Sequence, residues 1–262
     1  MPFANSEDGV EVYYEVHGKG PAILFVHGSG GQHAAWWQQV AALRDRHTVI
    51  TLDLRGFGNS TSDLDEYDSR RFPQDILAVI EAAGVERVVL LGQSIGAAAA
   101  LKAAIRRPDL HAGVILAHSL GGIDHPELAQ LVAADRAEAV KLPVLDRLMS
   151  ASFQEREPAK TFLFRQMGTF NRAKMQDLRN LNVDGPTLAA LRELGVKIFF
   201  LAGELDAVLS VSTVRRAHEL VEGSVLEVVP GAPHSMYWEL PEAFNAAVRR
   251  LLAIAYEAEA AA

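Results

Sequence analysis

The chain has 262 residues, of which 49% are hydrophobic and 22% are charged, as in a globular protein with a sizeable core. Its formal net charge of −8 argues against a nucleic-acid partner, and the lack of cysteine excludes disulfides, thiolate metal sites and a cysteine nucleophile. The N-terminal residues carry no apolar segment typical of a secretory signal, and no apolar run is long enough to span a bilayer. We therefore expect one domain, a cytoplasmic location and no membrane partner.

Seven short apolar runs predict strands. They cover residues 10–16, 22–26, 48–53, 87–91, 113–117, 196–201 and 225–229. The last five are nearly continuous aliphatic and β-branched residues, which suits strands covered on both faces of a parallel sheet. The first run is joined to the second by residues 18–21, Gly-Lys-Gly-Pro, which predict an antiparallel hairpin at one edge of the sheet.

Helical patterns separate these runs. They cover residues 36–44, 70–83, 95–106, 213–221 and 241–252. Strand and helix alternate as in a doubly wound α/β fold with a mostly parallel sheet.

One stretch interrupts the alternation. Residues 121–194 hold no convincing strand but contain four helical patterns, at 128–140, 142–150, 160–167 and 172–181. The stretch lies between two sheet strands, at the edge where open α/β sheets bind ligands. We expect a helical cap over 121–194, inserted into a single α/β core made of 1–120 and 195–262. Ordinary helical packing with no role in binding is the alternative.

Gly92-Gln93-Ser94-Ile95-Gly96 follows a strand pattern and opens a helix pattern, the context that the G-x-S-x-G motif requires. A serine on such a tight turn is lifted clear of the sheet, and the flanking glycines let strand and helix approach each other. The start of the helix also places backbone N–H groups where negative charge develops. We predict Ser94 as a nucleophile; a purely structural turn is the alternative.

A glycine-rich loop, residues 27–31, follows the strand pattern at 22–26. Glycines let the chain turn under the site and direct a backbone N–H inward, so we assign the two oxyanion donors to the N–H groups of Ser29 and Ile95. The loop lacks the P-loop lysine and the G-x-G-x-x-G spacing, so no nucleotide is expected. His27 is predicted to fix the loop by hydrogen bonding.

His234 lies in a loop just after the strand pattern at 225–229, where it can act as a base toward Ser94. Asp206 follows the pattern at 196–201 and precedes the histidine, which gives the chain order Ser, Asp, His. A buried carboxylate there would hold the tautomer of the imidazole and stabilise its charged form. Glu204 and Asp124 are the rival acids.

His118 ends the strand pattern at 113–117 and is a candidate to line the pocket. His118, Asp124 and His125 suggest a metal site, but their spacing matches no helical metal motif, so no metal is expected.

Large apolar side chains gather in the predicted cap and are candidates to line an apolar pocket. These are Leu145, Met149, Phe153, Phe162, Phe164 and Met167. A helix must bury one face, so packing against the core is the alternative for most of them.

Five ordered stretches together resemble the α/β-hydrolase superfamily, in its single-domain bacterial esterase and lactonase-like branch. They are residues 27–30, 53–60, 92–96, 203–206 and 231–234. The resemblance implies the α/β-hydrolase fold and the triad. It also implies that 53–60 is a structural loop, in which Asp53 and Arg55 stabilise the turn.

Two departures refine the resemblance. Family members that open epoxides or remove halide carry aspartate where this chain has Ser94, so those activities are disfavoured. Carbon–carbon bond hydrolases of the family often have tryptophan directly after the catalytic histidine, where this chain has Ser235.

We therefore expect a serine hydrolase that cleaves a carboxylic ester or lactone of a small apolar molecule through an acyl-enzyme, without a cofactor. Two alternatives stay open: a carbon–carbon bond hydrolase of a diketone-type substrate, and a ligand-binding receptor or interaction protein that retains the triad. A small-molecule substrate is the expected partner, and either a monomer or a homodimer is compatible with the sequence.

Overall fold

The computed structural model describes residues 2–60, 62, 67–181 and 183–260. Within them one eight-stranded sheet runs in the order β1-β2-β4-β3-β5-β6-β7-β8. The strands are β1 Phe3–Asn5, β2 Glu11–His17, β3 Ala22–Val26, β4 Thr48–Leu52, β5 Val88–Gln93, β6 His111–Ala117, β7 Ile198–Gly203 and β8 Val225–Val229. Neighbours from β4 to β8 are parallel, and β1 and β2 form an antiparallel edge, so the predicted fold class is confirmed.

The predicted hairpin between the first two long strands is wrong. β2 pairs with β4, with Tyr14 opposite Leu52, and β4 lies between β2 and β3. The connection at 18–21 crosses the turn that precedes β4, and it passes so close that a Cβ on Gly18 would lie 2.1 Å from the carbonyl oxygen of Arg44. Glycine at a φ of 78° makes this crossing possible, so the residues that resembled a hairpin turn serve as a crossover.

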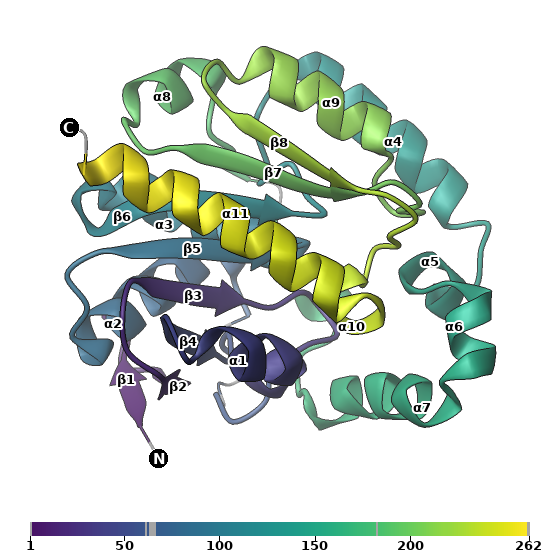
Figure 1. Cartoon of the computed structure of the whole chain (residues 1–262), viewed down its shortest axis with the longest axis horizontal. Helices are drawn as coiled ribbons and strands as arrows, with labels where there is room; N and C mark the ends of the chain where they lie inside the picture. Colours follow the sequence, from purple (N-terminus) through teal and green to yellow (C-terminus); the bar gives the residue numbers. More distant parts are fainter. Residues whose placement is uncertain (1, 61, 63–66, 182, 261–262) are drawn as a thin grey trace.

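Helices cover both faces of the sheet. They are α1 Trp37–Leu43, α2 Phe72–Ala83, α3 Ile95–Arg106, α9 Val211–Leu220, α10 Met236–Glu239 and α11 Pro241–Ala260. Helices α1, α10 and α11 share a buried apolar cluster with one face, and α2, α3 and α9 share a second cluster with the other; α1 and α11 lie across the front of Figure 1.

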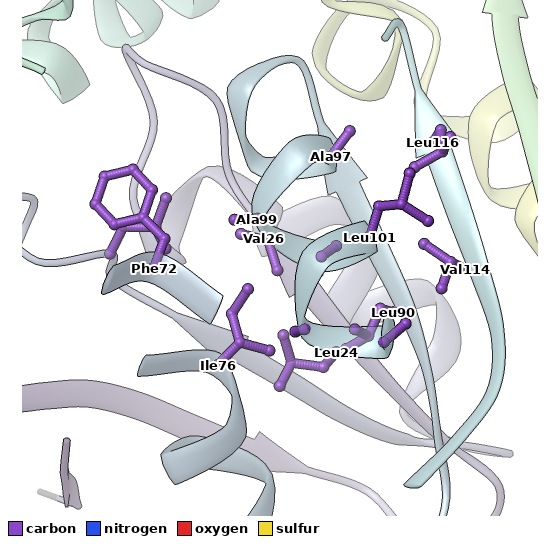
Figure 2. Close-up of a cluster of buried hydrophobic side chains, with 14 of the residues drawn as sticks. Leu24, Val26, Phe72, Ile76, Leu90, Ala97, Ala99, Leu101, Val114 and Leu116 are labelled. Carbon is purple, nitrogen blue, oxygen red and sulfur yellow. The ribbon is translucent and has the colours of Figure 1, made fainter. Parts of the chain in front are cut away.

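Alternation along the central strands explains the two clusters. In β3, Leu24 and Val26 belong to the α2/α3 side, whereas Ile23 and Phe25 belong to the α1/α11 side. Figure 2 shows Leu24 and Val26 among side chains from the α2/α3 side, such as Ile76. All five residues of β3 are buried, so an apolar run without polar interruption is the pattern that this position in the sheet requires.

Between β6 and β7 the chain is helical and contains α4 Pro126–Ala139, α5 Val144–Leu148, α6 Ala151–Arg156, α7 Pro158–Met167 and α8 Leu188–Glu193. We call residues 118–197 the insert. Helices α5, α6 and α7 lie on the side toward which the arrowheads of β3 and β7 point (Figure 1). Helix α4 instead packs on α9, where the Arg216 guanidinium donates to Glu127 at 2.7 and 3.0 Å.

The helix predicted at 172–181 is wrong. Only a 3-10 turn at Met175–Asp177 forms there. The surrounding backbone hydrogen-bonds to the core instead, because the Ala173 N–H donates to the Gly56 oxygen and the Arg179 N–H donates to the Tyr67 oxygen. These tertiary bonds replace the helical ones that the pattern indicated.

Within the part of the chain that the structure describes, no helix combines the length and apolar character needed to cross a membrane.

Candidate active site

Four polar side chains follow four adjacent parallel strands. Ser94 comes directly after β5, His118 directly after β6, Asp206 shortly after β7 and His234 shortly after β8. Because the carboxyl ends of parallel strands meet at one edge, the sheet gathers these residues there, on the side of α5, α6 and α7 in Figure 1.

Ser94 occupies a strained turn between β5 and α3. Its φ of 53° and ψ of −117° lie in a region that non-glycine residues rarely adopt, at a cost of about 1–3 kcal/mol. The turn admits no side chain two residues to either side: a Cβ on Gly92 would lie 2.4 Å from the Ala97 Cα, and one on Gly96 would lie 2.5 Å from the Val26 oxygen. The Ser94 N–H donates to the Ala117 oxygen at 3.0 Å, which fixes the turn to the end of β6.

The loop at 27–31 runs beside this serine: a Cβ on Gly28 would lie only 3.3 Å from the Ser94 Cβ. His27 fixes the loop, as predicted: its Nδ1–H donates to the Gly28 oxygen at 2.8 Å, and its Nε2 accepts from the Leu54 N–H at 3.0 Å. Complete burial lowers the pKa of His27, so the ring is neutral, as this pair of bonds requires.

Two backbone N–H donors, one in the loop at 27–31 and one directly after Ser94, are unused. Neither the N–H of Ser29 nor that of Ile95 donates a hydrogen bond to another described residue. Both residues are only half-buried, and Ile95 opens α3, whose first N–H groups have no partner within the helix. They are the two groups assigned from the sequence as oxyanion donors.

His234 and Asp206 are hydrogen-bonded to each other. The Nδ1 of His234 lies 3.0 and 2.9 Å from the two carboxylate oxygens of Asp206, and the N–H groups of Val208 and Leu209 donate to Oδ1 at 2.8 and 3.1 Å. A third side chain, His118, places its Nδ1 2.9 Å from Oδ2.

The Asp206 carboxylate is therefore held ionised. Burial alone would raise the pKa of this group, but the charge of His234 and the hydrogen bonds from His118 and His234 outweigh burial and hold the pKa well below its usual range. Since Asp206 occupies the Nδ1 of His234, the Nε2 is the ring nitrogen that the carboxylate leaves free. No hydrogen bond joins Ser94 and His234 among the residues described.

The rival acids lie elsewhere. The exposed Glu204 carboxylate accepts from the Gly231 N–H at 2.8 Å, and Asp124 pairs through its backbone with Thr187. Neither hydrogen-bonds to His234.

Among the described residues, one group of side chains could hold a metal ion. The ligand atoms of His118, Asp206 and His234 lie within 4.8 Å of one another. Both imidazole Nδ1 atoms, however, already have the carboxylate as their partner. Asp124 and His125, considered with His118 from the sequence, do not belong to this group.

The apolar residues proposed from the sequence to line the pocket separate into two sets. Five of them join the α1/α11 cluster, with Met149, Phe153 and Met167 buried and Leu145 and Phe164 partly buried. Phe164 lies edge-on to Trp238, with ring centroids 5.4 Å apart. Phe162 is 64% exposed and packs in neither cluster.

Arg55 and Asp53 stabilise the turn at 53–60, as the resemblance implied. The buried Arg55 guanidinium donates to Asp75 at 2.8 Å, and Asp53 accepts from the N–H groups of His33 and Asn59 at 2.6 and 2.8 Å.

Sequence reasoning missed Asn171. This buried amide in the insert donates to the Gly31 oxygen at 3.0 Å and accepts from the Gly58 N–H at 3.0 Å, so it joins the insert to the loop beside Ser94 and to the loop at 53–60. An asparagine in a polar stretch gives no signal of this role, because its partners are backbone groups far away in the sequence.

Comparison with known proteins shows a match to the alpha/beta hydrolase family over residues 23–247. The bifunctional biotin biosynthesis protein of Cellvibrio japonicus is 29% identical over 248 residues, which cover 87% of this chain. The chain spans less than half of the first two curated relatives it matches, 47% and 41% of their lengths.

Two further relatives match over most of their length. The 3-oxoadipate enol-lactonase 2 of Acinetobacter baylyi is 24% identical, with 88% of each chain covered. The solved structure of a thermophilic esterase from Thermogutta terrifontis superposes with a TM-score of 0.82 at 25% identity, covering 97% of this chain and 98% of the esterase.

Proposed function

The chain belongs to the alpha/beta hydrolase family, and from this premise we propose that it is a serine hydrolase that cleaves a carboxylic ester or lactone of a small apolar molecule. The observation that carries the proposal is the arrangement of one strained serine and one hydrogen-bonded aspartate–histidine pair at one edge of the sheet, after β5, β7 and β8. The similarity to an esterase and an enol-lactonase supports the same class of bond.

In the proposed reaction, the Nε2 of His234 takes the proton of the Ser94 hydroxyl as the oxygen attacks the substrate carbonyl. Asp206 stabilises the imidazolium that forms and keeps its Nδ1–H oriented. The unused N–H groups of Ser29 and Ile95 donate to the oxyanion; loss of one such donor typically costs about 10²–10³ in kcat.

His234 then gives its proton to the leaving alkoxide, which departs as an alcohol and leaves an ester on Ser94. Water enters, His234 takes a proton from it, and the attack on the acyl carbon releases the carboxylic acid and restores the serine. A lactone follows the same steps, except that the alcohol and the acid leave as one molecule.

We further propose that the insert forms the cap over this site and supplies apolar contacts to the acyl group. Helices α5, α6 and α7 lie beyond the strand ends (Figure 1). Leu145 and Phe164 of the insert are partly buried and pack against the α1/α11 cluster. An apolar wall of this kind favours an uncharged acyl chain.

Covalent labelling tests the nucleophile. A fluorophosphonate probe should add one label per chain, located on Ser94 by peptide mass analysis, and Ser94→Ala should abolish both labelling and aryl-ester turnover. Labelling at another residue, or persistent labelling of Ser94→Ala, would overturn the assignment.

A substrate panel then separates the reaction classes. Turnover of simple aryl esters and lactones is the expected result. Turnover of vinylogous diketones alone would identify a carbon–carbon bond hydrolase, and binding without turnover would identify a receptor.

A further inference from the structure

His118 is held in an unusual backbone conformation directly after β6. Its φ of 54° lies in the left-handed region that favours glycine, yet its N–H donates to the Leu201 oxygen at 2.9 Å and so extends the pairing with β7. Its side chain is 0% exposed. The neighbouring strands thus hold an unfavourable conformation that directs a buried imidazole into the candidate site.

This imidazole shares an acceptor with His234. The Nδ1 atoms of His118 and His234 both lie 2.9 Å from the Oδ2 of Asp206, and the two rings meet edge to face with centroids 5.4 Å apart. An ionised carboxylate only accepts hydrogen bonds, so each Nδ1 carries a proton. The buried Nε2 of His118 has no partner among the described residues and holds the lone pair of a neutral ring.

The hydrogen bonds and burial of the cluster of His118, Asp206 and His234 set its charge state. Burial lowers the pKa of His118 and keeps it neutral, although its hydrogen bond to Asp206 acts in the opposite direction. Among the described residues, the titratable side chains that hydrogen-bond to Asp206 are His118 and His234. The two imidazoles and the carboxylate therefore form one hydrogen-bonded cluster.

We propose that His118 is a positioning residue of the candidate triad: its Nδ1–H fixes the Asp206 carboxylate on the Oδ2 side and shares the charge of that oxygen with His234. The inference rests on the function proposed above. This role is distinct from contact with substrate, because the His118 side chain is enclosed and hydrogen-bonded to Asp206.

The physical reason is competition for one oxygen. A carboxylate that also accepts from a neutral donor offers less charge to the His234 imidazolium, so the charged form of His234 is less stabilised. The same bond fixes the plane of the carboxylate on the Oδ2 side, while the N–H groups of Val208 and Leu209 fix it on the Oδ1 side.

Two substitutions separate hydrogen bonding from packing. His118→Leu removes the donor and keeps an apolar side chain in the space. His118→Asn places an amide nitrogen at the position of Nδ1 relative to the backbone, and asparagine tolerates the left-handed conformation.

The pH dependence of kcat/KM for an aryl ester is the measurement. In His118→Leu the acidic limb should move to higher pH by about 0.5–1 unit, and the plateau should fall about tenfold. His118→Asn should stay within about twofold of the unsubstituted protein at every pH. An unshifted limb in His118→Leu, or equal profiles for the two variants, would refute the role as a donor.

A second measurement needs neither turnover nor a variant. NMR of the unsubstituted protein labelled with ¹⁵N-histidine at neutral pH should show the Nδ1–H tautomer for both His118 and His234. An Nε2–H tautomer at His118 would overturn the inference even if His118→Leu failed to fold. If no ester is hydrolysed, the proposed function fails, yet the tautomers still report on the bond to Asp206.

Discussion

Replacement of Asp206 by asparagine introduces an NH₂ group, which cannot accept hydrogen bonds from the N–H donors that surround the carboxylate. Oδ1 accepts from the N–H groups of Val208 and Leu209, Oδ2 faces the Nδ1 of His118, and the Nδ1 of His234 lies 3.0 and 2.9 Å from Oδ1 and Oδ2. An amide oxygen at Oδ1 leaves the NH₂ group facing the ring N–H of His118 and competing with that of His234, so at least one imidazole must change tautomer. The opposite orientation sets the NH₂ against backbone N–H groups, which have no second tautomer.

The consequence for His234 determines the size of the effect. In the Nε2–H tautomer this ring has no lone pair for the Ser94 proton, and the neutral amide no longer stabilises the imidazolium. We expect kcat to fall by about 10⁴, which corresponds to about 5.4 kcal/mol of transition-state stabilisation. KM should change little, because the carboxylate does not contact substrate in the proposed reaction.

Steady-state hydrolysis of an aryl ester near pH 8 measures this loss. Glu204→Gln and Asp124→Asn are the matched controls, since each makes the same chemical change at a carboxylate that does not touch His234; both should stay within about threefold of the unsubstituted protein. Circular dichroism should show an unaltered fold in all three variants. A loss below tenfold in Asp206→Asn, or an equal loss in Asp124→Asn, would refute the assignment of the acid.

Four further outcomes are expected. Gly96→Ala should destabilise the fold by at least about 2 kcal/mol, because its Cβ would lie 2.5 Å from a carbonyl oxygen, whereas Gly30→Ala has open space and should stay within about 0.5 kcal/mol in urea unfolding. Arg55→Met leaves the buried Asp75 carboxylate unpaired and should cost about 3–5 kcal/mol at neutral pH. Because burial raises the pKa of Asp75, that loss should shrink as the pH falls and the carboxyl is protonated; a constant loss would contradict the explanation. Asn171→Ala should lower kcat more than it raises KM, since it frees the loop at Gly31, and a change in KM alone would count against this. Specificity constants should rise from acetyl to hexanoyl aryl esters by up to about 0.8 kcal/mol per buried methylene, and a flat series would exclude an apolar acyl pocket.

Local sequence patterns predicted the parts of the fold whose structure depends on a few neighbouring residues. The turn at Ser94 needs glycine at two fixed positions, and both are visible in the sequence because no other residue fits. The apolar runs of the central strands are equally direct, since burial on both faces leaves no place for a polar side chain.

Features decided by distant contacts were not visible. The residues at 18–21 suit a hairpin turn, and only the position of β4 makes them a crossover. The segment at 172–181 has a helical pattern, but its N–H groups reach carbonyl oxygens of the core. The bond from His118 to Asp206 joins residues 88 positions apart, so the sequence offered a pocket-lining histidine and could not show its partner.

The order of the chain also affects how this fold is made on the ribosome. Helix α11 supplies Phe244, Val248 and Leu251 to the cluster that covers the α1/α11 face of the sheet, yet it follows every strand in the sequence. At about 5–20 residues per second, the stretch from Ala117 to Pro241 takes roughly 6–25 s to synthesise. During that time Ile23, Phe25 and other apolar side chains on that face have no α11 to cover them. A nascent chain of this architecture therefore exposes an aggregation-prone apolar surface for seconds. Production in a host with abundant ribosome-associated chaperones should raise the soluble yield.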